Sequence, residues 1–99
     1  MILKLHPLAE NDLKIALNYY FDISPKLEKR FLSHIDKDFS NILNSPNLYK
    51  YETETSQKVI MKKFPYIIIY EQYEDIIMIL AIFHTKQNPI KLLDRYNKI

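Results

Sequence analysis

The chain has 99 residues, of which 47% are hydrophobic and 26% are charged, with a net charge of +2 and neither cysteine nor glycine. Such a length supports a single two-layer core, so we expect residues 1–99 to form one folded domain. The composition excludes disordered, collagen-like and coiled-coil proteins. Without cysteine there are no disulfides or thiolate zinc sites, and without glycine there are no glycine-rich loops that cradle phosphates.

The apolar runs and the charges indicate a compartment and a class of partner. The longest apolar run, Ile76–Phe83, has eight residues, whereas a membrane-spanning helix needs about 20. The apolar run within residues 1–6 is too short for a signal peptide, and a chain without cysteine suits a reducing compartment. We therefore expect a cytoplasmic protein with no membrane partner. Residues 56–99 carry seven basic and four acidic side chains, which favours an anionic partner for that half.

The N-terminal half predicts a strand followed by two helices. Residues 2–5 are apolar and precede Pro7, which cannot continue a β-ladder, so they predict a short strand. From Leu8 onward, apolar residues recur with the spacing of an amphipathic helix, at Ala9, Leu13, Ala16, Leu17 and Tyr20. Ser24 and Pro25 are typical of an N-cap and a first helical position. They open a second helix, whose apolar stripe is Leu27, Phe31, Ile35, Phe39 and Ile42.

Three further strands follow the second helix, which ends at Ser45–Asn47. The segments that predict them are rich in β-branched and aromatic residues: Lys58–Lys62, Phe64–Tyr70 and Ile76–Phe83. The polar residues 72–75 predict a hairpin turn between the last two. Without glycine, the turns must rely on Asn, Asp, Ser or Pro. Because both strands of this hairpin are apolar on both faces, each face of the sheet needs a cover.

The expected fold class is α+β. An antiparallel helix hairpin should pack on one face of a mainly antiparallel four-stranded sheet that includes the N-terminal strand. A short C-terminal helix, within residues 89–96, is all that remains for the other face. A partly covered face would suit a partner peptide that folds over it. The alternative is that residues 89–96 close this face unaided.

Short motifs recur along nearly the whole chain in a fixed order. In chain order they are Ala9 with Asp12 and Leu13, Tyr19–Tyr20, Arg30–Phe31, Pro46, Phe64–Tyr66 with Ile68 and Tyr70, Ile79–His84, Pro89 and Arg95. Their order and spacing resemble the RelE/ParE superfamily of bacterial toxins. The chain departs from that pattern at three places. Lys58 and Lys86–Gln87 stand where the family often has arginine, and Leu92 stands near a position that is often aromatic.

The resemblance implies a toxin of a bacterial type II toxin–antitoxin system, a growth inhibitor of the kind also called a plasmid stabilisation protein. Its implied partner is a cognate antitoxin, in a toxin–antitoxin hetero-oligomer. RelE-like members cut messenger RNA in the ribosome, whereas ParE-like members bind DNA gyrase. A third possibility is an inactive member that only binds antitoxin. We expect a ParE-like gyrase binder, because the residues available for catalysis are few.

For a nuclease, the resemblance places His84 as base or acid, with Lys62 and Arg95 stabilising charge on the phosphate. Further contacts to RNA or to another target would come from Lys58, Lys63, Tyr70 and Lys86. The competing interpretations are structural: a strand-end His84 bonded to backbone, and an Arg95 paired with Asp94 or Glu71. No two histidines have the i, i+4 spacing of metal ligands, so we expect no metal and no cofactor.

Overall fold

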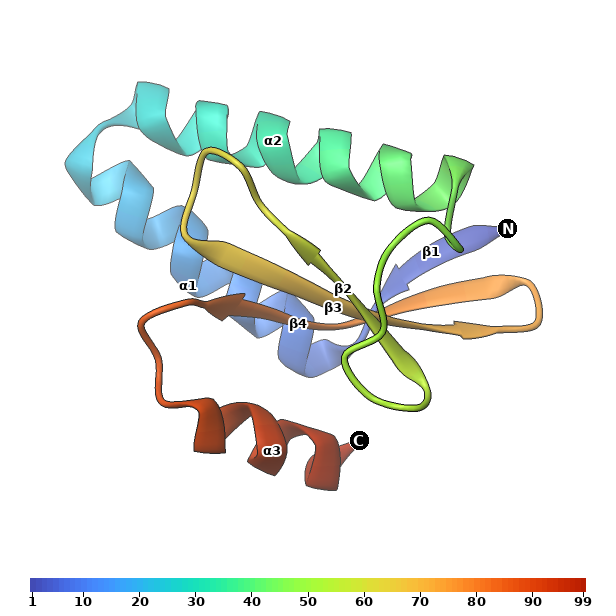
Figure 1. The fold of residues 1–99 in the computed structure, drawn as a ribbon. Helices are drawn as coiled ribbons and strands as arrows, with labels where there is room; N and C mark the ends of the chain where they lie inside the picture. The colour runs from blue at the N-terminus through green and yellow to red at the C-terminus, as the bar shows by residue number, and fades with distance from the viewer.

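The structure is a computed structural model that describes all residues from 1 to 99 (Figure 1). Its elements in chain order are β1 (Ile2–Leu5), α1 (Pro7–Ile23), α2 (Pro25–Asn44), β2 (Ser56–Ile60), β3 (Tyr66–Tyr73), β4 (Ile76–His84) and α3 (Pro89–Lys98). This confirms the expected order of a strand, two helices, three strands and a C-terminal helix. None of the helices combines the length and the hydropathy that crossing a membrane requires.

The two long helices both begin with a proline in the first turn, where its missing N–H costs no hydrogen bond. Nδ1 of His6 caps α1 by accepting a hydrogen bond from the backbone N–H of Leu8, at 3.1 Å. Ser24 lies at the expected N-cap position of α2, but its side chain makes no capping hydrogen bond. Its backbone N–H donates to the Tyr20 carbonyl instead. Because Ser24 alone joins the helices, α1 and α2 pack against each other.

The four strands form one sheet in the order β1-β4-β3-β2. The β2–β3 and β3–β4 pairs are antiparallel, as expected, whereas β1 runs parallel to β4. The sheet is therefore mixed. Parallel neighbours need a long crossover, and here α1, α2 and the first two strands of the meander supply it. The β3–β4 register shifts between Ile69 and Tyr70, where Leu80 is the extra residue of a bulge in β4.

The observed strand boundaries differ from the expected ones by a few residues. The strand expected over Lys58–Lys62 is Ser56–Ile60. β3 starts at Tyr66 because the preceding Pro65 has no N–H to give to a ladder. The β3–β4 turn is reduced to Glu74 and Asp75, since Tyr73 still pairs with Ile76. Glu74 has a φ of 46°, so a glutamate takes the left-handed position in a chain that has no glycine.

The two faces of the sheet have different covers. The helices α1 and α2 cover one face, and a cluster of 15 buried residues fills the space between them and the sheet. At one end of this core, four aromatic rings lie against one another, those of Tyr20, Phe31, Phe64 and Tyr66. The outer face carries α3, whose Leu92 and Tyr96 pack on a smaller cluster of Ile69, Leu80 and Ala81.

The C-terminal helix closes the outer face only in part. Ile60 pairs with Ile67 and Ile67 pairs with Phe83, so the three form a row across β2, β3 and β4 on this face. Ile60 is 63% exposed, and Ile67 and Phe83 are half-buried. The face is therefore only partly covered, because α3 packs on the middle of the face and leaves this apolar row at its end.

Candidate functional site

The C-terminal helix is anchored by an ion pair. Arg95 of α3 donates two hydrogen bonds to the Asp12 carboxylate of α1, from Nη1 to Oδ2 at 2.7 Å and from Nη2 to Oδ1 at 2.9 Å. Nη1 also donates to the Leu80 carbonyl at 3.1 Å. The two charged side chains are only 21% and 16% exposed. A bidentate pair with so little exposure fixes the position of α3, and we call Asp12 and Arg95 the α3 anchor.

The α3 anchor also completes the edge of β4. β1 pairs with β4 only as far as Leu5 opposite Ile79, so the later residues of β4 have no strand on that side. The backbone N–H of Ile82 donates to the anchor's carboxylate at 3.0 Å, and the Leu80 carbonyl accepts from its guanidinium. The anchor therefore takes the place of a neighbouring strand by satisfying these two backbone groups.

The prediction that Arg95 pairs with Asp94 or Glu71 is wrong. Asp94 is its neighbour along α3, and adjacent residues of a helix point in different directions. Glu71 is already engaged, because its carboxylate accepts hydrogen bonds from the hydroxyls of Thr55 and Tyr73. The actual partner lies on α1, 83 residues away in the sequence. No local spacing rule connects positions so far apart.

His84 lies at the end of β4, half-buried, as expected. Its Nδ1 accepts a hydrogen bond from the backbone N–H of Lys86 at 3.0 Å, and its ring packs edge-on against Tyr66 with centroids 5.0 Å apart. The backbone contact is the one that a structural role would need. It occupies Nδ1, so Nε2 is the nitrogen left for any other partner. Asp12, Tyr66 and Ile82 line the same shallow hollow as His84.

Tyr70, expected at a binding surface, lies in the core instead. Its side chain is fully buried, and its hydroxyl donates to the Pro46 carbonyl at 2.5 Å. Burial raises the pKa of Tyr70 to about 12, and the neighbouring Tyr49 and Tyr51 add to the rise. The strand is apolar on both faces, so its sequence did not indicate which residues face the helices. Tyr70 therefore anchors the α2–β2 connection and presents nothing to a ligand.

The lysines suggested for binding are scattered. Lys58 pairs with Glu52 at 2.8 Å, across the outer edge of β2. Lys62 and Lys63 lie in the loop between β2 and β3 and are exposed next to α2. Lys86 is exposed in the loop after β4. Only Lys62 and Lys63 come together in one place.

The three side chains suggested for nuclease activity line three separate hollows. His84 lines the one beside Asp12, Lys62 lines a cavity next to α2, and Arg95 lies between α1 and the outer turns of α3. The guanidinium of Arg95 is committed to the α3 anchor. No group of three or more histidine, aspartate or glutamate side chains is placed to hold a metal ion.

Sequence reasoning missed a buried polar cluster centred on Gln57, which is 1% exposed. Its Nε2 donates to the carbonyls of Pro46 and Tyr49 at 2.8 and 3.0 Å, and its Oε1 accepts from Gln72 at 2.7 Å. With the Tyr70 hydroxyl, this cluster ties the α2–β2 connection to the sheet. The alternation of β2 carried a usable signal, because a residue two before the inward-facing Val59 must also face inward.

The fold is shared with bacterial toxins of known structure. The chain is similar to a chain of the chromosomal ParDE toxin–antitoxin system from P. aeruginosa, with a TM-score of 0.76, 19% identity, and coverage of 87% of this chain and 97% of that one. It is also similar to the isolated E. coli RelE toxin, with a TM-score of 0.57, 11% identity, and coverage of 99% and 98%. The fold is therefore that of the RelE/ParE toxins, as the motifs predicted.

The sequence comparisons narrow this class. The model of the family described as ParE toxin of type II toxin-antitoxin system, parDE, matches residues 3–89. Toxin ParE2 of Mycobacterium tuberculosis, in strains CDC 1551 / Oshkosh and H37Rv, is 27% identical over 88 residues, which cover 88% of this chain and 84% of the relative. The chain belongs to the ParE toxin family of type II toxin–antitoxin systems, and that family implies an antitoxin partner.

Proposed function

We propose that this ParE-type toxin arrests bacterial growth by binding DNA gyrase and that it does not cut messenger RNA. Gyrase is the target that the resemblance to ParE-like toxins implies, and a cytoplasmic site of action follows from it. Cutting RNA requires a base, an acid and a cation that converge on one phosphate. The observation that supports a binding mode of action is that these groups do not converge: Lys62 and His84 line different hollows, and the guanidinium of Arg95 is committed to Asp12.

The test is to add the purified chain to two reactions, gyrase supercoiling and ribosomal translation with mapping of messenger RNA 5′ ends. We expect saturating toxin to abolish supercoiling and to leave the messages intact. Unchanged supercoiling would overturn the proposal. New 5′ ends that disappear in the His84→Ala/Lys62→Ala double variant would establish the alternative, a ribosome-dependent endoribonuclease. Induction in a bacterial host without any growth defect would indicate an inactive member that only binds antitoxin.

For the antitoxin, we propose that a segment disordered on its own folds as a helix or strand over the apolar row that α3 leaves open. The row crosses three strands, and Ile60 at its edge is 63% exposed, so a partner can bury it without unfolding the toxin. Ile60→Lys should weaken antitoxin binding at least about tenfold, since it places a charge in an apolar contact. Ile15 of α1 is equally exposed, at 62%, and Ile15→Lys is the matched control. Weakening by Ile15→Lys alone would place the antitoxin elsewhere.

A further inference from the structure

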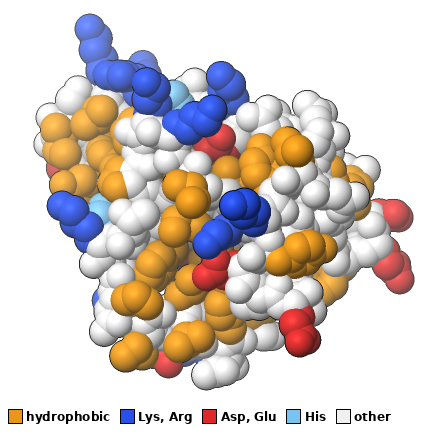
Figure 2. Space-filling model, in the orientation of Figure 1, with side chains coloured by type: hydrophobic (Ala, Val, Ile, Leu, Met, Phe, Trp, Pro, Cys, Tyr) orange, Lys and Arg blue, Asp and Glu red, His pale blue; other side chains and the backbone are white.

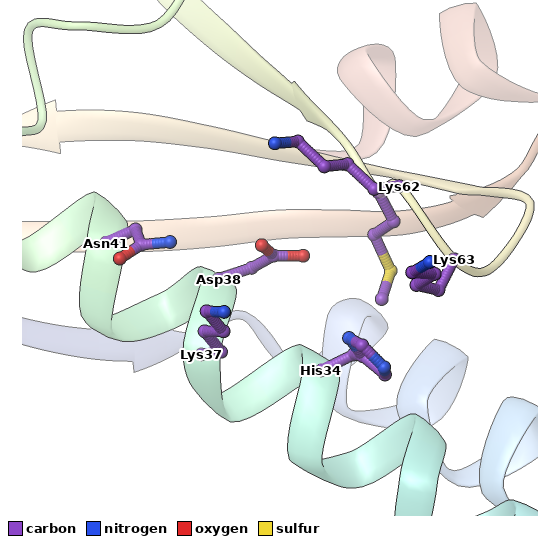
Figure 3. A pocket seen from close by; sticks show the side chains of 7 residues that line it. His34, Lys37, Asp38, Asn41, Lys62 and Lys63 are labelled. Carbon is purple, nitrogen blue, oxygen red and sulfur yellow. The ribbon is translucent and has the colours of Figure 1, made fainter.

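A cavity of 170 Å³ lies between α2 and the loop that joins β2 to β3. Four residues of α2 line it at helical spacing, namely His34, Lys37, Asp38 and Asn41, and the loop contributes Met61, Lys62 and Lys63. Figure 3 shows the four α2 side chains along one side of the helix, facing the loop that carries the two lysines. Met61 is the only hydrophobic residue of the lining. The cavity is therefore a polar site formed by two elements.

Its charges are unbalanced. Three ammonium groups, those of Lys37, Lys62 and Lys63, share the cavity with a single carboxylate, that of Asp38. None of the three lysines has a salt-bridge partner, because the two salt bridges of the chain are at β2 and at the α3 anchor. Burial raises the pKa of Asp38, and the charges of His34, Lys37 and Lys62 oppose that rise, so all three act on the same carboxylate. The lining of the cavity therefore carries a net positive charge.

The cavity lies on the basic side of the molecule. In Figure 2 lysine and arginine side chains gather along the upper edge, where α2 and the β2–β3 loop lie in Figure 1. Acidic side chains project at the right-hand end, near the β3–β4 turn with its exposed Glu74 and Asp75. A field with this polarity draws a polyanion towards the α2 side and orients it there.

The lining favours phosphate over other anions of biological size. A peptide that folds on binding needs apolar surface to bury, and Met61 is the only such residue here. A nucleobase needs an aromatic ring to stack on, and the lining offers only the imidazole of His34, which already packs against Phe64 with centroids 5.4 Å apart. Lysines act as point charges that suit a phosphate and read no base. The side chains of the lining therefore suit a contact to a sugar–phosphate backbone.

We propose that this cavity binds a backbone phosphate of a nucleic acid, independently of sequence, through Lys37 of α2 and Lys62 and Lys63 of the loop. Duplex DNA is the probe that tests it. Asn41 and His34, which also line the cavity, add side-chain donors. This goes beyond gyrase binding and does not rest on it, because the toxin can hold DNA whether or not gyrase is its target.

The negative charge of Asp38 provides a second test of the proposal. Its carboxylate lies inside the cavity and repels a phosphate, so it lowers the affinity that the lysines alone would give. Removing its charge should therefore strengthen DNA binding, whereas removing lysine charge should weaken it. A general electrostatic attraction would respond equally to any acidic residue of α2. Asp36, which is exposed two positions away, supplies that comparison.

The test is fluorescence anisotropy with a labelled DNA duplex, over a series of salt concentrations, on the full chain and four variants. Lys62→Gln/Lys63→Gln should raise the Kd about tenfold and reduce the slope of log affinity against log salt by about 1, the loss of one phosphate contact. The control pair Lys4→Gln/Lys14→Gln removes the same charge from exposed sites on β1 and α1 and should have a much smaller effect. Asp38→Asn should lower the Kd several-fold, and Asp36→Asn should change it little.

Several outcomes would overturn the proposal. One is no DNA binding by the full chain at low salt, and another is equal weakening by the two lysine pairs. If inorganic phosphate shifted the NMR amide signals of His34 and Asn41 while DNA did not bind, the source would be a free phosphate and the nucleic-acid assignment would be wrong. Thermal melts of every variant must match the parent chain. Because gyrase inhibition is measured separately, failure here leaves the proposed target untouched.

Discussion

The two faces of the sheet are held by different kinds of interaction. On the helix-covered face, 15 buried residues form one continuous core, with Phe31, Ile35 and Ile68 fully enclosed. On the outer face, only three hydrophobic residues of the sheet are buried, and no residue of α3 is. What holds α3 is the bidentate Asp12–Arg95 pair together with Leu92 and Tyr96. One cover is hydrophobic and extensive, and the other is small and partly electrostatic.

This difference indicates that the two covers have different local stabilities. Segments with little buried apolar surface open at a lower free energy than the global unfolding of the protein. We therefore expect α3 to open and close while α1, α2 and the sheet stay folded. Opening would uncover Ile69, Leu80 and Ala81, which lie beside the apolar row proposed for the antitoxin.

The largest expected effect comes from a substitution that disrupts the core between the two long helices and the sheet. Phe31→Ala removes a fully buried ring that contacts Tyr20, Phe64 and Tyr66, and it should lower the free energy of unfolding by about 3–5 kcal/mol. Leu92→Ala, which truncates a half-buried side chain of α3, should lower it by only about 1 kcal/mol. Urea unfolding followed by circular dichroism measures both. Equal losses would show that the two faces form one cooperative unit.

A smaller and more local effect should follow from breaking the α3 anchor. Arg95→Lys keeps the charge but cannot reproduce the two bonds to Asp12 and the third to Leu80, so α3 should loosen at a cost of about 2 kcal/mol. We expect amide exchange in α3 to become much faster and binding of a hydrophobic dye to rise, with exchange in α2 unchanged. Lys91→Arg, on an exposed position of the same helix, is the control. Uniformly faster exchange in α2 and α3 would contradict a separate α3 unit.

Periodicity in the sequence predicted the helices and the β3–β4 hairpin, because each carries apolar residues at the spacing of its own geometry. It could not predict the parallel pairing of β1 with β4 or the contact between Asp12 and Arg95, since both join distant segments and leave no local pattern. It also misplaced Tyr70, because alternation does not orient a strand that is apolar on both faces. Of the cavity next to α2, the sequence indicated only Lys62 and Lys63. Its other side is formed by α2, which lies earlier in the chain, so no local pattern joins the two.

The smallest expected effect is a loss of stability at alkaline pH that involves the helix-covered face. Burial raises the pKa of Tyr70 to about 12, against an ordinary value of 10.0. The unfolded chain therefore loses this proton at a lower pH than the folded chain, so stability that is fully present below pH 10 is lost as the pH rises from 10 to 12. Tyr66 lies on the same face, and burial raises its pKa as well, so it adds to this loss.

Tyr70→Phe should separate two effects of the buried hydroxyl on stability, its hydrogen bond to the Pro46 carbonyl and its raised pKa. At pH near 8 the variant loses the hydrogen bond to the Pro46 carbonyl and should be about 1 kcal/mol less stable. Near pH 11 the parent chain has lost part of its Tyr70 contribution, so the difference should close. Urea midpoints at the two pH values measure this difference, with Tyr19→Phe, at an exposed position of α1, as the control. A difference that stays constant with pH would mean that Tyr70 titrates alike in the folded and unfolded chains, and the alkaline sensitivity of this face would then rest on Tyr66.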